Sequence, residues 1–220
     1  MYNDNERRYE AMDLSTLHFE LDYNSPVILT YLFLSLGACL LNGITRGRSN
    51  KLFFTNYRSS LLNPLTYVRM FTHSIGHLNF DHLIHNFLFI LLIGPMIEEK
   101  YGSINLILMF LITSFVIALF NMIFNDYVIT GASGNVYMLI VLSSFSNLTE
   151  GKIPLTLILV LIFYVASEVR KSITEGNKKV YHDGHLIGAI MGVVFGFYFL
   201  YLPPLPFIGH VLFDVFSLLC

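Results

Sequence analysis

Ser133 lies between glycines in the sequence Gly131-Ala132-Ser133-Gly134, where an apolar segment begins. Glycine permits close backbone approach and unusual dihedral angles, and the start of a helix presents unpaired N–H groups and the positive end of its dipole. These features suit a serine nucleophile whose reaction generates an oxyanion. The same residues also fit a plain helix start with Ser133 as its N-cap, so the motif alone leaves both interpretations open.

Two further residues fit a serine-based chemistry. Tyr137 follows Ser133 by four residues, which puts both on one helix face, where an aromatic ring can pack on an imidazole. His185 opens the segment Gly184–Gly188, and glycines recur at positions 192 and 196. Because glycine at every fourth position lets a neighbouring helix approach closely, we expect His185 to lie tight against another helix. An ordinary interfacial tyrosine and a snorkelling histidine are the alternatives.

Histidines are concentrated ahead of Asn86. His73, His77, His82 and His85 fall within thirteen residues. His82 and Asn86 are four residues apart and therefore share a helix face. Both can donate hydrogen bonds to a developing negative charge. His73 and His77 precede that helix and are interpreted as structural, and the pattern assigns no role to His85.

Six apolar segments must position these residues, namely 26–44, 82–97, 103–124, 134–146, 153–167 and 184–202. A helix needs about 20 residues to cross the hydrocarbon core. We therefore expect an all-α membrane protein with six transmembrane helices and a long loop, residues 45–81, between the first two. Residues 1–25 are expected to form a polar lead-in, 26–202 one membrane domain, and 203–220 an interfacial tail.

The fourth segment is too short to cover the full thickness of the hydrocarbon core. Its 13 residues cover about 20 Å of a core that is about 30 Å thick. Its N-terminus should therefore lie below the membrane surface, reached by extended chain. Non-helical backbone at that depth is tolerated only inside protein or beside a water-filled cavity. The sequence thus predicts a submerged, water-filled pocket at Gly131–Gly134.

Composition supports a bilayer as the solvent. Of the 220 residues, 55% are hydrophobic and 13% are charged, where a soluble domain carries about 25% charge. The net charge of -2 argues against nucleic-acid binding, which needs a concentrated basic face. Cys39 and Cys220 give no disulfide framework and no CxxC signal. We expect no cofactor and no metal.

Taken together, the motifs resemble those of rhomboid intramembrane proteases. VRMFTHSIGHLNFDHLIHN resembles the family's loop-to-second-helix signature, GASGNVY resembles its GxSG motif with a following tyrosine, and GHLIGAIMG resembles its sixth-helix motif. Their order and the six-segment frame agree over residues 26–202. The resemblance implies a six-helix bundle and a serine endopeptidase that cleaves transmembrane segments. The family often has a tryptophan before its loop arginine, where this chain has Val68.

The resemblance also implies roles for the matching residues. Ser133 would attack the scissile carbonyl, and His185 would take its proton and return it to the leaving amine. His82 and Asn86 would bind the oxyanion, with help from the Ser133 N–H. Tyr137 would stack against His185.

The remaining motif residues are structural by the same resemblance: Arg69, Gly131, Gly134 and Gly188. The family works with a dyad and requires no orienting carboxylate, so Asp183 receives no catalytic role. His182 receives none either.

The implied partners are transmembrane protein substrates within a lipid bilayer, and a bacterial plasma membrane is the expected location. The family's topology places the N-terminus in the cytosol. However, the loops that would then lie outside carry more Lys and Arg than those inside, against the positive-inside rule. Orientation, natural substrate and oligomeric state remain open.

Two other functions match parts of the sequence. Three histidine pairs superficially resemble the histidine boxes of membrane metal oxidases, and imidazole clusters suit iron; the pairs are His73/His77, His82/His85 and His182/His185. Such enzymes use more ligands and adjacent His-His pairs. A non-catalytic rhomboid-like protein that binds membrane helices is the other alternative. Those proteins usually lack the serine or the histidine, and this chain has both.

Overall fold

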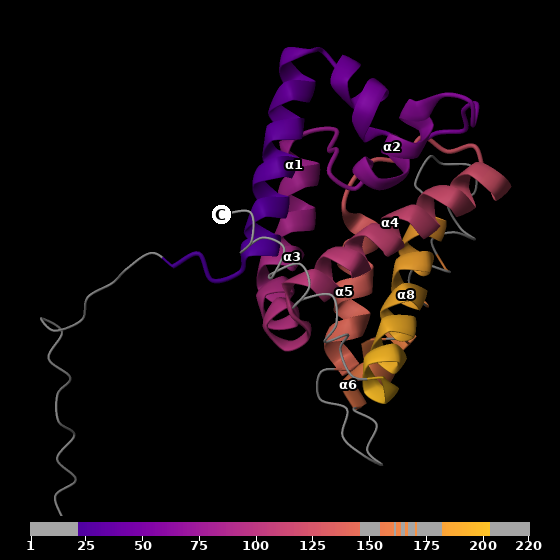
Figure 1. Cartoon of the computed structure of the whole chain (residues 1–220). Coiled ribbons are helices and arrows are strands. Elements are labelled where there is room, and N and C mark those ends of the chain that lie inside the picture. Colours follow the sequence, from indigo (N-terminus) through magenta and orange to yellow (C-terminus); the bar gives the residue numbers. More distant parts are fainter. Residues whose placement is uncertain are drawn as a thin grey trace, which may run out of the picture.

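The computed structural model describes residues 22–145, 155–160, 162–163, 166, 170 and 182–202. Nearly all of the expected lead-in, the whole C-terminal tail and part of the fifth apolar segment lie outside these residues. The regular elements of the described part are helical: α1 (Pro26–Ile44), η2 (Asn50–Phe54), α2 (Pro64–Thr72), α3 (Phe80–Tyr101), α4 (Ser103–Phe124), α5 (Ser133–Phe145), α6 (Leu155–Val160) and α8 (His182–Tyr201). Figure 1 shows α5 in the middle of the bundle, between α3 and α8.

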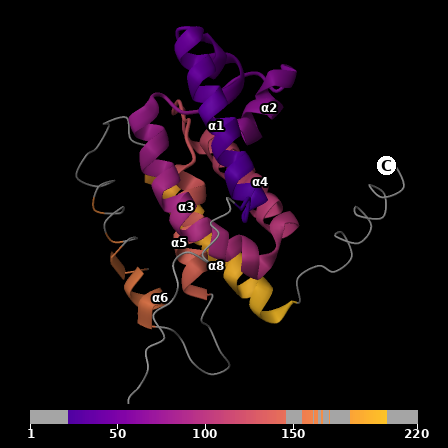
Figure 2. The ribbon, with the colours of Figure 1, turned by 90° about the vertical axis from the view of Figure 1, so that its left-hand side faces the viewer.

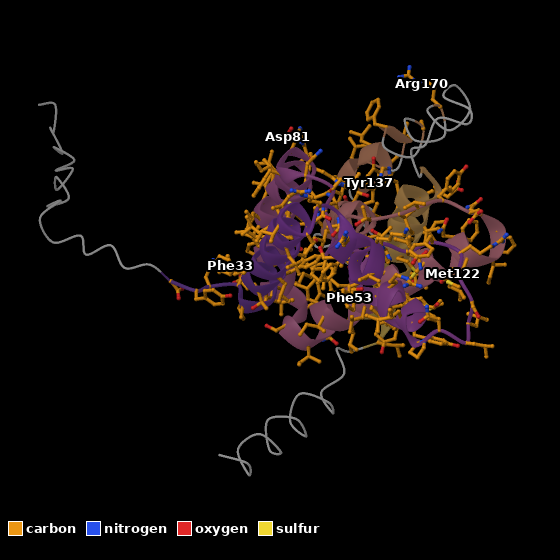
Figure 3. All side chains as sticks on the ribbon, turned by 90° about the horizontal axis from the view of Figure 1, so that it is seen from above. Phe33, Phe53, Asp81, Met122, Tyr137 and Arg170 are labelled. Atoms are coloured by element: carbon orange, nitrogen blue, oxygen red, sulfur yellow. The ribbon has the colours of Figure 1, made fainter. Side chains whose placement is uncertain are left out.

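Four of the described helices are long and apolar enough to cross a membrane, namely α1, α3, α4 and, from Asp183 onward, α8. Most of their exposed side chains are apolar. Leu88 and Leu92 on α3 are 64% and 76% exposed, and Phe33 on α1 lies at the outer edge in Figure 3. An exterior so rich in apolar side chains is typical of contact with a membrane. The all-helical membrane architecture expected from the sequence is thus confirmed at this level.

Helix α5 forms the centre of the bundle. Ten of its 13 residues are buried, so protein surrounds it on nearly every side. A Cβ atom on Gly188 of α8 would lie 2.1 Å from the carbonyl oxygen of Gly134, and one on Gly192 would lie 2.6 Å from that of Met138. Only glycine fits at these positions, and the close approach of α8 predicted from its glycine spacing is confirmed.

Helix α3 is longer than the sequence predicted. It continues past Ile97 to Tyr101, although Glu98 interrupts the apolar run. The buried Glu98 carboxylate accepts hydrogen bonds from the backbone N–H groups of Val27 and Ile28, at 3.0 and 3.2 Å. These are unpaired donors of the first turn of α1, and Ser25 offers no side-chain cap there. A charged residue therefore stays inside the bundle because it caps a neighbouring helix.

The segment between α1 and α3 contains two short helical elements, η2 and α2, where the sequence suggested a plain loop. Figure 2 places α2 at the same end of the bundle as the C-terminal end of α1. The Arg69 side chain is buried on α2. It donates hydrogen bonds to the Leu52 carbonyl at 3.3 Å and the Ser59 hydroxyl at 2.9 Å, and its guanidinium lies 4.5 Å from the centre of the Tyr57 ring. One buried arginine thus ties η2, α2 and the intervening chain together.

Candidate active site

Ser133 and His185 meet where the N-terminal ends of α5 and α8 converge. The Nε2 atom of His185 lies 3.0 Å from the Oγ atom of Ser133, although 52 residues separate them in the chain. Ser133 is the first residue of α5, and His185 lies in the first turn of α8. The contact between Gly188 and Gly134 holds these two helix ends together.

An extended segment leads into α5. Asn56 and Ile129 exchange two backbone hydrogen bonds of 2.9 Å, and the Gly131 N–H donates to the His73 carbonyl at 2.8 Å. The buried Asn121 side chain of α4 makes two hydrogen bonds with the Tyr127 backbone. Its amide nitrogen donates to the Tyr127 carbonyl, and its amide oxygen accepts from the Tyr127 N–H. The extended entry expected from the sequence is present, and several of its backbone groups are hydrogen-bonded to neighbouring segments.

Tyr137 supports the imidazole. Its ring and that of His185 are stacked, with centroids 4.4 Å apart and planes 6° apart. In the view of Figure 3, Tyr137 lies nearer the middle of the molecule than Asp81, which lies at the edge. The four-residue spacing from Ser133 therefore places serine, imidazole and phenol ring in one cluster.

His82 and Asn86 converge on the backbone just before Ser133. A Cβ atom on Gly131 would lie 2.8 Å from His82 Nε2 and 3.5 Å from Asn86 Nδ2. Gly131 also has a φ of 119°, and residues with a Cβ atom strongly disfavour this backbone conformation. Glycine is required here on both counts. Two nitrogen atoms that can donate hydrogen bonds thus face the backbone beside the serine.

A cavity of about 660 Å³ opens at this point. Its lining mixes polar and apolar side chains and includes Ser133, His185, His82, Asn86, Tyr137, His85, Asn135 and Ser114. Polar groups line the space, so water can occupy it. The cavity lies at Gly131–Gly134, where the sequence predicted a pocket.

His73 lines the cavity and His77 lies behind it, and both are buried. His73 Nε2 donates to the Ser114 carbonyl at 3.0 Å. Burial lowers the pKa of His73 to about 4, although that hydrogen bond favours the charged form. Burial also lowers the pKa of His77 to about 4, and repulsion from His82 adds to the effect. Both rings are therefore neutral at pH 7.

His85 and Asp183, which the sequence left without roles, contact backbone and side-chain groups near the site. His85 donates from Nδ1 to the Asp81 carbonyl at 2.6 Å, and it lines the cavity. The Asp183 carboxylate accepts from the Asn125 amide at 3.0 Å, which links the start of α8 to the end of α4. The His182 side chain lies outside the described residues.

Several groups of the site were missed by sequence reasoning, among them the Asn125–Asp183 link and a contact between His77 and Asn86. In each contact the two residues do not belong to the same helix, so helical spacing in the sequence cannot predict that they meet. Within the described ranges, no three His, Cys, Asp or Glu side chains are grouped so that they could hold a metal ion. Ring nitrogens of His73, His77 and His85 instead bond to backbone carbonyls.

The chain is similar to known proteins. The family model described as Rhomboid domain matches residues 64–202, more than half of the chain. A stretch of 119 residues is 26% identical to the rhomboid protease GluP of Bacillus subtilis (strain 168), and it covers 52% of this chain and 24% of that protein. The chain thus spans about a quarter of the length of this curated relative. The match to the domain, which includes every residue of the cluster around Ser133, shows that this chain belongs to the rhomboid family.

Proposed function

We propose that this protein is an intramembrane serine endopeptidase in which Ser133 is the nucleophile and His185 is the general base. The observation that carries the proposal is the 3.0 Å contact between His185 Nε2 and Ser133 Oγ. A serine hydroxyl is a weak nucleophile until a base within hydrogen-bonding reach accepts its proton. The neighbouring side chains supply the remaining parts of such a site.

In the first half of the reaction, the Ser133 oxygen attacks the carbonyl carbon of the scissile peptide bond while His185 Nε2 takes the hydroxyl proton. The C–N bond then breaks, and His185 returns that proton to the leaving amine nitrogen. The product is an ester between Ser133 and the acyl half of the substrate. Stacking against Tyr137 keeps the imidazole plane fixed while its charge changes.

The oxyanion would be bound at the backbone beside Ser133. His82 Nε2 and Asn86 Nδ2 both face Gly131, and the Ser133 N–H lies at the start of α5. The buried Nδ1 atom of His82 has no hydrogen-bond partner among the described residues. An unpaired acceptor is less costly than an unpaired donor, so the His82 proton is expected on Nε2, where it can be donated.

Water completes the reaction. A water molecule in the cavity attacks the acyl-enzyme carbonyl, His185 takes the water proton, and the same proton returns to the Ser133 oxygen as the ester bond breaks. The polar lining of the cavity supplies a place for this water. The central position of α5 keeps the cavity inside the helix bundle.

The class of substrate is inferred from the bilayer that surrounds the site. A peptide bond inside a bilayer is shielded by its own helix, so we infer that transmembrane segments with residues that weaken helices are cleaved. We also infer six spans, with α5 and the fifth apolar segment added to the four helices that are long enough. The relative from Bacillus subtilis carries the word protease in its name and favours a bacterial plasma membrane.

Cleavage of a model single-span protein in proteoliposomes tests the proposal. Wild type should cut within or near the transmembrane segment, while Ser133→Ala and His185→Ala should abolish cutting. Asn86→Ala should leave measurable activity with kcat lowered about 10²–10³-fold, the usual cost of losing one oxyanion donor. Asn105→Ala serves as the control, because it removes an amide on α4 that donates only to the Tyr101 carbonyl at the end of α3 among the hydrogen bonds of the described residues.

If folded wild type does not cut any of several single-span proteins and matches Ser133→Ala, the protease assignment is wrong. The non-catalytic, helix-binding alternative would then stand. No observation favours the metal-oxidase alternative.

A further inference from the structure

His77 lies directly behind the two proposed oxyanion donors. Its side chain is 0% exposed. The Nε2 atom of its ring is 3.1 Å from Asn86 Nδ2, and its ring meets that of His82 edge to face with centroids 5.1 Å apart. One buried imidazole therefore contacts both residues that would face the oxyanion.

The hydrogen bonds of His77 fix which ring nitrogen carries the proton. Nδ1 lies 3.1 Å from the Ile75 carbonyl oxygen, which can only accept, so Nδ1 must donate. A neutral imidazole has one proton, and Nε2 is therefore left with a lone pair. Burial lowers the pKa of His77 to about 4, so this neutral form is the one present at pH 7.

This tautomer in turn fixes the Asn86 amide. A lone pair on His77 Nε2 accepts from an N–H group and repels the amide oxygen. Asn86 must therefore present its NH₂ group and not its carbonyl to His77. The NH₂ group has two protons in one plane. Since one is donated to His77, the direction of the other is also set, on the Nδ2 atom that faces Gly131.

Without this contact, Asn86 could turn its amide over. The oxygen and nitrogen of a side-chain amide are nearly equal in size, so packing alone discriminates poorly between the two orientations. The reversed amide would direct a partial negative charge toward the place where the oxyanion forms. Preorganised donors stabilise a transition state because they do not have to reorient during the reaction.

We propose that His77 is a positioning residue, which holds the Asn86 amide in the orientation that donates to the oxyanion. This role rests on the proposed function of the site. His77 is itself held in place: its carbonyl accepts from the Asn50 amide at 2.9 Å, and its ring packs on Phe87 with centroids 5.8 Å apart. The ring does not line the cavity, and acts on the reaction through Asn86.

A double-mutant cycle tests this role. His77→Met removes the acceptor, and His77→Gln has nearly the same size and restores an acceptor oxygen. In an otherwise wild-type protein, His77→Met should lower kcat by at least about tenfold and at most by the loss seen for Asn86→Ala. KM should change less than about threefold. His77→Gln should recover most of that kcat. In the Asn86→Ala background, both substitutions should change kcat less than about twofold.

A second measurement detects the contact between His77 and Asn86 without requiring substrate cleavage. Nitrogen NMR of protein labelled in histidine should show His77 protonated on Nδ1 and unprotonated on Nε2 at pH 7. Asn86→Ala should shift the Nε2 resonance. Asn105→Ala should leave it unchanged.

The two measurements separate the outcomes. Equal losses from His77→Met in the presence and absence of the Asn86 amide would show a general structural role and overturn the proposal. A proton on Nε2 would also overturn it, even if His77→Met failed to fold. The expected NMR spectra combined with an inactive wild type would refute the protease assignment and the positioning role, while the hydrogen bond itself would stand.

Discussion

The Ser133–His185 pair depends on how the imidazole is held. Because Nε2 must face the serine, rotation of the ring about its side-chain bonds would remove the base from its position. The Tyr137 ring covers one face of the imidazole at 4.4 Å. An aromatic contact of this kind contributes about 0.5–1.5 kcal/mol beyond burial of its area.

We predict that Tyr137→Leu lowers kcat about two- to tenfold, the effect of losing that stacking energy. Tyr137→Phe keeps the ring and should remain closer to wild type than Tyr137→Leu does. The measurement is steady-state cleavage of a single-span substrate. Tyr67→Leu on α2, where the ring is 50% exposed, is the matched control and should behave like wild type. Equal losses in Tyr137→Phe and Tyr137→Leu would contradict a role for the ring.

Some residues of the site could be identified from the sequence, and others could not. Ser133, His185 and Tyr137 lie in short motifs with helical spacing, and the structure brings all three together. His77 was interpreted only as structural. Its contact with Asn86 depends on how the chain from α2 enters α3, which spacing does not encode. The buried amides of Asn121 and Asn135 escaped notice for the same reason.

At the scale of elements, the contact between α5 and α8 aligns the site. Backbone meets backbone at Gly134 and Gly188, so a single added methyl group has no space. Relief would require α8 to move outward, and His185 would move with it. Misplacement of a reacting group by about 1 Å can cost about 10²-fold in rate.

We therefore predict that Gly188→Ala lowers kcat by about 10²-fold or more and also lowers the melting temperature. The measurements are substrate cleavage and thermal unfolding in detergent. Gly37→Ala is the matched control, since it adds the same methyl group to α1 with no atom within 4 Å. It should preserve activity and melting temperature. Wild-type activity in Gly188→Ala would show that the close approach is not needed.

The sequence predicted most elements correctly. The bounds of α1 and α4 agree with the apolar runs, and α8 begins two residues before its expected start. The predicted end of α3 was too early, because a charged residue such as Glu98 usually marks the end of an apolar segment. The backbone groups of α1 that bind Glu98 cannot be identified from the sequence spacing. The short helices η2 and α2 were missed because neither is long enough to give a clear period.

At the scale of the whole molecule, buried histidines make stability depend on pH. The pKa values of His73 and His77 are about 4 in the folded protein against an ordinary value of 6.5. Between those values the unfolded chain binds more protons than the folded one. Stability therefore rises with pH in this window and is lost as pH falls from about 6.5 towards 4.

We predict that the melting temperature in detergent falls as pH is lowered through this range. His73→Gln and His77→Gln each remove one titrating ring and keep an amide that can hydrogen-bond, so each should reduce the slope. Glu99→Gln, on the exposed side chain next to Glu98, controls for a general change in charge. Parallel pH profiles for wild type and both histidine variants would contradict this account.

The central claim concerns Ser133 as an activated nucleophile. Wild-type protein in detergent, treated with a fluorophosphonate probe and analysed by peptide mass spectrometry, should carry the probe on Ser133. His185→Ala should reduce this labelling strongly, and Ser133→Ala should abolish it. Absence of labelling in folded wild type, or equal labelling of Ser133→Ala, would contradict the account.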